Sequence, residues 1–152
     1  MRTTTTPDVA ETSAVAERVH RDEERQAIRL HGLHVDVERR GYDILLARLH
    51  GDIDIASAPG LRRCVDLVPE HGRGLVLDLD GVEFLGSAGI SILVDLARNP
   101  PREDVRWAVA ASGRAVLRPL EATGYLNLVP AYPTVDAAMA AVRSAGGTRH
   151  SG

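Results

Sequence analysis

The sequence predicts a single α/β or α+β domain whose mixed, mostly parallel β-sheet is packed by about four helices. The spacing of apolar residues switches repeatedly between period two and the three-to-four spacing of an amphipathic helix, so strands and helices alternate along the chain. In addition, the run Leu75, Val76, Leu77 and Leu79 is apolar on both faces, which is typical of a strand in the middle of a parallel or mixed sheet.

Apolar patterns and turn residues define the individual elements. Two strands over 33–37 and 44–49 come first, and we expect them to pair antiparallel. A helix capped by Ser57 then runs toward Gly72. The remaining elements are a strand over 75–79, a helix that stops before Asn99-Pro100-Pro101, a strand over 105–109, a helix around 116–120 that contains Pro119, a short strand over 126–129 and a last helix capped by Thr134.

The domain is expected to span about residues 31–145, between two flexible tails. Residues 1–30 are rich first in threonine and then in charged residues, and their apolar residues bury too little surface to offset the entropy of ordering. A weak helix over 15–30 that acts as an arm for a partner is the alternative. Residues 146–152 are polar and glycine-rich, which is typical of a loose chain end.

Composition excludes several function classes. A net charge of -3 and a pI near 6.0 lack the basic excess that nucleic-acid binding requires. No signal peptide or membrane span is expected, and the single Cys64 leaves no partner for a disulfide or a thiolate zinc site. Nucleotide-binding glycine loops are absent from the sequence. We therefore expect a cytoplasmic protein without a cofactor or a metal.

The segment 82–90 is the strongest candidate for a functional site, because it places Ser87 at the start of a helix just after a buried strand. Free backbone N–H groups and the positive end of the helix dipole would stabilise a phosphate on Ser87 there. From the residues alone, Ser87 is either such an acceptor or simply the cap of the helix. Ser91, one turn later, is a second acceptor or a polar surface position. The glycine spacing differs from that of a hydrolase elbow, so no enzyme is expected.

Three stretches of the chain share the motifs of a known family. Residues 49–59, Leu-His-Gly-Asp-Ile-Asp-Ile-Ala-Ser-Ala-Pro, look like its Gly-Glu-Leu-Asp strand end and the helix start that follows. Residues 75–90 resemble its signature Asp-Leu-Ser-x-Val-x-Phe-Asp-Ser-x-Gly, and residues 121–125 with 132–138 look like its C-terminal end. By this resemblance the chain is identified as a STAS domain protein of the bacterial anti-sigma factor antagonists, also called anti-anti-sigma factors.

The resemblance implies a partner switch that acts on transcription indirectly. In this family the dephosphorylated antagonist binds an anti-sigma factor, usually one with a histidine-kinase-like ATP-binding fold, and so releases a sigma factor. The anti-sigma factor phosphorylates the serine of the signature, which matches Ser87 here, and a metal-dependent serine phosphatase removes the phosphate. The resemblance implies no catalytic activity for the chain itself.

The expected partner-binding residues surround Ser87. They are Asp52, Asp54, Ser57, Gly86, Ser87, Ala88, Gly89 and Ser91. For the two aspartates, a solvated turn is the alternative interpretation. Gly86 departs from the family signature, which usually has an acidic residue immediately before the serine. The alternative function is therefore a STAS scaffold or accessory subunit that binds a protein partner without a phosphorylation cycle.

Overall fold

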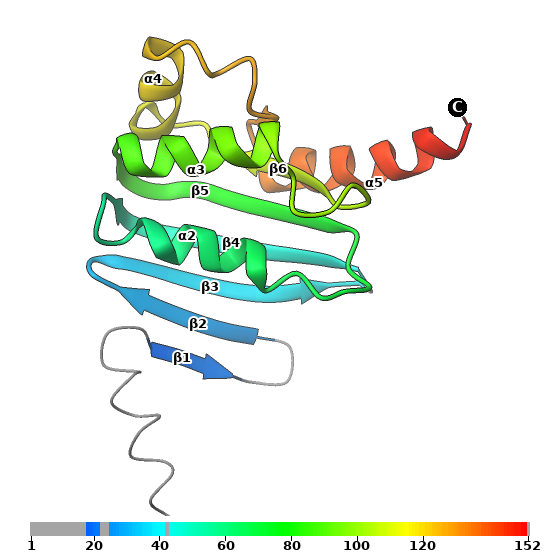
Figure 1. Ribbon diagram of the computed structural model, residues 1–152, viewed down its shortest axis with the longest axis horizontal. Helices are drawn as coiled ribbons and strands as arrows, with labels where there is room; N and C mark the ends of the chain where they lie inside the picture. The colour runs from blue at the N-terminus through cyan, green and yellow to red at the C-terminus, as the bar shows by residue number, and fades with distance from the viewer. Residues whose placement is uncertain (1–17, 22–24, 42, 152) are drawn as a thin grey trace, which may run out of the picture.

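The structure is a computed structural model that describes residues 18–21, 25–41 and 43–151, with the side chains of 18–21 and 145–151 left outside the description. The strands of these residues form one seven-stranded sheet in which they follow each other in chain order (Figure 1). They are β1 (Arg18–Arg21), β2 (Arg25–Leu30), β3 (Leu33–Arg40), β4 (Ile44–Ile53), β5 (Gly74–Leu85), β6 (Arg106–Ala110) and β7 (Ala131–Tyr132).

The sheet changes its pairing mode at β4. Strands β1 to β4 pair antiparallel, and strands β4 to β7 pair parallel. Each parallel pair is joined through a helix, as parallel pairing requires. The crossover helices are α2 (Ala58–Asp66), α3 (Ser87–Arg98) and α4 (Arg114–Ala122), and α5 (Val135–Ser151) follows the last strand. The predicted α/β class with an antiparallel first pair is confirmed, although parallel pairings are half of the described sheet and not most of it.

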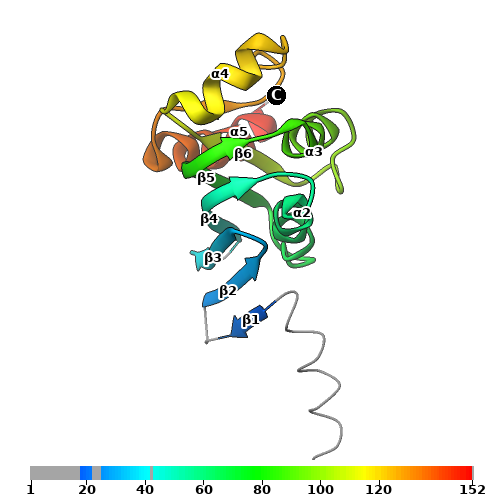
Figure 2. The same cartoon turned by 90° about the vertical axis from the view of Figure 1, so that its left-hand side faces the viewer.

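Helices cover both faces of the sheet. Helices α2 and α3 lie on one face and α5 lies on the other (Figure 2). The alternation along β5 explains this arrangement, because Leu75 and Leu77 belong to the larger core under α2 and α3, whereas Val76 packs with Met139 and Val142 of α5. A strand that packs helices on both faces must be apolar throughout, as the sequence of β5 is.

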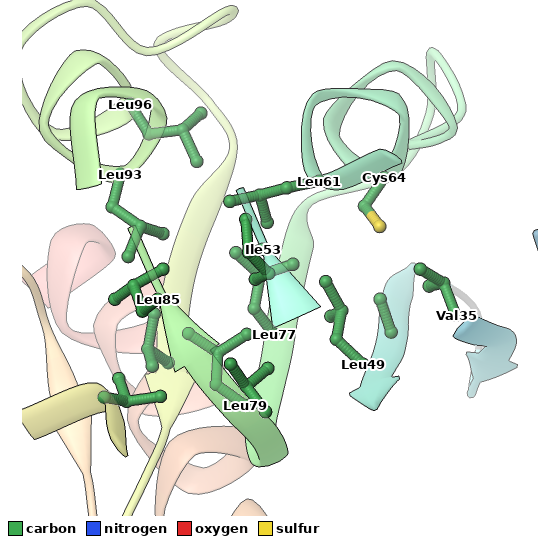
Figure 3. Packing of buried hydrophobic residues seen from close by; sticks show 14 of the residues in the cluster. Val35, Leu49, Ile53, Leu61, Cys64, Leu77, Leu79, Leu85, Leu93 and Leu96 are labelled. Carbon is green, nitrogen blue, oxygen red and sulfur yellow. The ribbon is translucent and has the colours of Figure 1, made fainter. Parts of the chain in front are cut away.

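The larger core joins α2 and α3 to the sheet. Figure 3 shows Leu61 and Cys64 of α2 and Leu93 of α3 above the sheet residues Leu49 and Leu77, and all five are fully buried or nearly so. Burial raises the pKa of the Cys64 thiol to about 12, so this cysteine packs as an apolar side chain and does not form a reactive thiolate.

The prediction of a flexible N-terminal tail is wrong for those of its residues that the structure describes. Residues 18–21 and 25–30 form β1 and β2 instead, and β2 pairs with β3 along its whole length. Only alternate residues of β2 face the core, where Ile28 and Leu30 are buried, so the strand is stable despite its charged outer positions. The rest of residues 1–30 lies outside the described residues. At the other end, α5 carries helical backbone through Ser151, where a loose end over 146–152 was predicted.

The predicted strand over 126–129 is also wrong, because these residues form turns. The N–H groups of Leu128 and Val129 donate to the carbonyl oxygen of Tyr125 at 3.0 and 3.2 Å, so they are not available to a sheet. The strand begins two residues later, as β7. The predicted Thr134 cap is confirmed, since the Thr134 hydroxyl accepts the Ala137 N–H at 3.0 Å.

Candidate functional site

The segments after β4 and β5 lie next to each other. Because the two strands are parallel neighbours, their carboxyl ends meet at one edge of the sheet, with Asp52 opposite Phe84 and Ile53 opposite Leu85. The Gly86 N–H donates to the Ile53 carbonyl oxygen at 2.8 Å, which continues the pairing into the start of α3. The fold thus brings the two predicted site segments, 52–57 and 86–91, together.

Ser87 is the first residue of α3 and its side chain is exposed. Gly86 occupies the N-cap position, and its carbonyl oxygen accepts the N–H groups of Gly89 and Ile90 at 3.1 Å each. Ser87 is therefore not the cap, which removes the capping interpretation of this serine. An exposed hydroxyl one residue inside a helix N-terminus is placed where the helix dipole favours a negative charge.

Gly89 fixes the position of this helix start. An ideal Cβ on Gly89 would lie 2.6 Å from Leu85 Cδ1 and 2.7 Å from Ile53 Cγ2, both of which belong to buried side chains. Only glycine lets the first turn of α3 pack this closely on the ends of β4 and β5. Gly89 is itself buried, so it shapes the site from beneath.

Asp54 and Ser57 hold the turn after β4. Asp54 Oδ1 accepts the N–H groups of Ala56 at 3.1 Å and Ser57 at 3.0 Å, and Ser57 Oγ lies 3.0 Å from the same oxygen. Ser57 Oγ also lies 2.7 Å from the Asp52 carbonyl oxygen, so its single proton serves one of these two acceptors at a time. Hydrogen bonds from the backbone and the side chain of Ser57 lower the pKa of Asp54.

Ser57 does not form the cap that its position predicts. It precedes α2, but its side chain bonds to the turn and makes no hydrogen bond to the helix N–H groups. Ser57 is also fully buried, so its side chain cannot touch a partner directly. It acts by holding Asp52 and Asp54 in place.

The other predicted site residues differ in exposure. Asp52, Ser87 and Ser91 are exposed, and Gly86 and Ala88 are half-buried. Ser91 lies one turn beyond Ser87 and lines a shallow pocket beside α3, together with Asp95, Arg98 and Tyr125.

Sequence reasoning missed the two most exposed large apolar residues of the described chain. Ile55 is 84% exposed in the turn after β4, and Phe84 is 53% exposed at the end of β5. Both had a sequence signal, because Ile55 stands between Asp54 and Ala56 in a polar turn and Phe84 is the chain's single phenylalanine.

The described residues offer no candidate metal site and no candidate membrane-spanning helix. None of their His, Cys, Asp and Glu side chains gather in threes in a way that could hold a metal ion. Over the same part of the chain, none of the helices is both long and apolar enough to cross a bilayer.

Comparison with known proteins places this site within a family. The model of the STAS domain family matches residues 34–138, and the chain belongs to that family. A relative at 30% identity is the anti-sigma-F factor antagonist RsfB of Mycobacterium tuberculosis, with a match over 66% of this chain and 82% of RsfB. The anti-sigma-F factor antagonist RsfA of the same species is 33% identical over 44% of this chain and 52% of RsfA.

Solved structures show the same fold. The crystal structure of an anti-sigma factor antagonist from Mycobacterium paratuberculosis superposes with a TM-score of 0.65 at 35% identity, over 73% of this chain and 94% of that one. The unphosphorylated form of the anti-sigma factor antagonist SpoIIAA gives a TM-score of 0.59 at 15% identity, over 72% of this chain and 96% of that one, and this likeness concerns the fold alone. The named relatives are antagonists, which is a regulatory binding role and not an enzymatic one, as predicted.

Proposed function

We propose that this protein is an anti-sigma factor antagonist controlled by phosphorylation of Ser87. It binds an anti-sigma factor of the serine-kinase type, with a histidine-kinase-like ATP-binding fold, and so releases a sigma factor in the bacterial cytoplasm. The partner phosphorylates Ser87 and ends the interaction, and a serine phosphatase restores it. The observation that carries the proposal is the exposed Ser87 at the first position of α3, on the same edge of the sheet as two exposed apolar side chains.

The position of Ser87 suits a phosphate that blocks docking and leaves the fold intact. A phosphoserine carries nearly two negative charges at pH 7, and the N-terminus of α3 stabilises a negative charge locally. Docking, however, would strip water from that phosphate, and the exposed apolar side chains of Ile55 and Phe84 at this edge of the sheet offer it no hydrogen bonds in return. Phosphorylation is therefore expected to weaken the complex far more than it weakens the fold.

Two substitutions test the switch. Ser87→Ala removes the acceptor, and Ser87→Asp places a permanent negative charge there. Each is titrated against the kinase-fold anti-sigma factors of the same genome, purified one at a time. We expect the Ala variant to bind as tightly as the unmodified protein and the Asp variant to bind about tenfold or more weakly.

The control variant is Asn127→Asp, which adds the same charge at an exposed position in the segment after α4. It should retain the affinity of the unmodified protein. Equal affinities of Ser87→Ala and Ser87→Asp would contradict the switch.

A STAS scaffold or accessory subunit without a phosphorylation cycle is the second candidate, and Gly86 in place of the usual acidic residue favours it. Phosphopeptide analysis of the protein from its own cells separates the two functions. Phosphate on the Ser87 peptide supports the switch. A Ser87 peptide that stays unmodified under every growth condition, together with equal binding of the two variants, would establish the scaffold.

A further inference from the structure

Two of the three exposed large apolar side chains of the described residues flank the start of α3. Phe84 precedes Gly86 by two residues. Ile55 lies two residues after Ile53, and the Ile53 carbonyl oxygen accepts the Gly86 N–H. The third, Leu128, lies three residues after Tyr125, whose ring contacts Arg98 at the far end of α3. Apolar surface held in water at one edge of the fold is typical of a protein contact.

The Phe84 ring lies against the backbone of Gly86. An ideal Cβ on residue 86 would be 3.0 Å from Phe84 Cε2 and 3.4 Å from Phe84 Cζ. The backbone of Gly86, with φ −86° and ψ 178°, is open to any residue, so its conformation does not require glycine. A side chain on residue 86 would therefore press against the exposed Phe84 ring.

Charge around this apolar pair has one sign. The segments 51–57 and 82–91 contain three acidic residues, Asp52, Asp54 and Glu83, and no lysine or arginine. Asp52, which lies opposite Phe84 in the sheet, and Glu83, which precedes Phe84 in β5, are both exposed. A complementary surface therefore has an apolar centre with basic side chains at its rim.

We propose that Phe84 and Ile55 are the apolar anchors of the docking surface around Ser87, and that they insert into an apolar pocket of the anti-sigma factor whose rim carries arginine or lysine. This inference rests on the proposed function and specifies the chemistry of the partner surface. Gly86 leaves the centre of this surface uncharged, whereas a carboxylate on residue 86 would place a charge there.

The test uses alanine variants of the full chain and the purified anti-sigma factor that binds the unmodified protein. Phe84→Ala and Ile55→Ala each remove one anchor, and Leu128→Ala is the matched control, because Leu128 is an exposed apolar residue outside the site. Removal of a central aromatic or aliphatic anchor should weaken binding at least about tenfold, whereas the control should stay within about twofold. Thermal melts of all three variants check that each is folded.

Gly86→Ala provides a second measurement on the same surface. It adds no charge, but its Cβ would crowd the Phe84 ring, 3.0 Å from Cε2, so binding should again weaken. Normal affinity of Phe84→Ala and Ile55→Ala would overturn the anchors while leaving the antagonist function in place. Equal losses in the anchor variants and in Leu128→Ala would also overturn them. If none of the anti-sigma factors bound the unmodified protein, the proposed function would fail, and the anchors with it.

Discussion

Asp54 is stabilised as a carboxylate by its own turn. Its Oδ1 atom accepts two backbone N–H groups and lies within hydrogen-bond distance of the Ser57 hydroxyl. These bonds favour the charged form, so the pKa of Asp54 is lower in the folded chain than in the unfolded one. A lowered folded pKa means that the ionised carboxylate stabilises the fold above its unfolded pKa, and that this stabilisation is lost as the pH falls through the folded pKa.

The corresponding prediction compares the unmodified chain with Asp54→Asn, which keeps an accepting oxygen but has no charge. Denaturant unfolding should show the unmodified chain gaining stability over the variant between acid pH and pH 6, with the change centred below about 4. Asp52→Asn, at an exposed position two residues earlier, is the control variant. A stability difference independent of pH would show that the charge of Asp54 does not support the turn.

At the scale of one element, the start of α3 depends on Gly89. Gly89→Ala would force its methyl group into Leu85 and Ile53, whose side chains are buried and have little room to move. Overpacking of this kind costs about 1–3 kcal/mol, which exceeds the gain in helix propensity of up to about 1 kcal/mol. We therefore expect the variant to lose about 1–2 kcal/mol of unfolding free energy in urea titrations. Ser91→Ala, at an exposed position of the same helix, should lose no unfolding free energy. If Gly89→Ala also kept the unfolding free energy of the unmodified chain, α3 would be able to shift on the sheet.

Elements with strong apolar periodicity could be predicted from the sequence, and elements with weak apolar periodicity could not. The helix over α3 was predicted because its apolar spacing is regular and Asn99-Pro100-Pro101 stops it. The prediction of a strand over 126–129 is wrong because the apolar residues of this segment lie in turns. Apolar residues in turns follow neither the two-residue period of a strand nor the 3.6-residue period of a helix. Ser87 and the two site segments, 52–57 and 86–91, could be found from sequence motifs. The exposure of the Ile55 and Phe84 side chains could not, because it depends on tertiary packing.

For the whole molecule, composition concealed the first two strands of the sheet, β1 and β2. Helix α5 packs on β5, β6 and β7 and also covers Ile44 and Leu46 of β4, so the outer residues of β2 and β3 on that face remain in contact with water. Opposite charges meet across this face, as in the Arg25–Glu38 and Arg48–Asp78 pairs at 3.6 Å each. A strand that is charged on one face and apolar at only two inner positions has the composition of a solvated tail. For this reason the sequence places the residues of β2 in the predicted N-terminal tail.

The last prediction tests whether β2 belongs to the cooperative core. A chain over 31–152 lacks β1 and β2, and a chain over 18–152 keeps both. Loss of the buried Ile28 and Leu30 side chains should lower the unfolding free energy by roughly 3–6 kcal/mol, at about 1.5–3 kcal/mol for each. In the full chain, Ile28→Ala should cost about 2–5 kcal/mol, whereas Arg29→Ala, at the exposed neighbouring position, should cost no more than about 0.5 kcal/mol. Equal stability of the two truncated chains would mean that the domain folds without β2 and that the first strand of its core is β3.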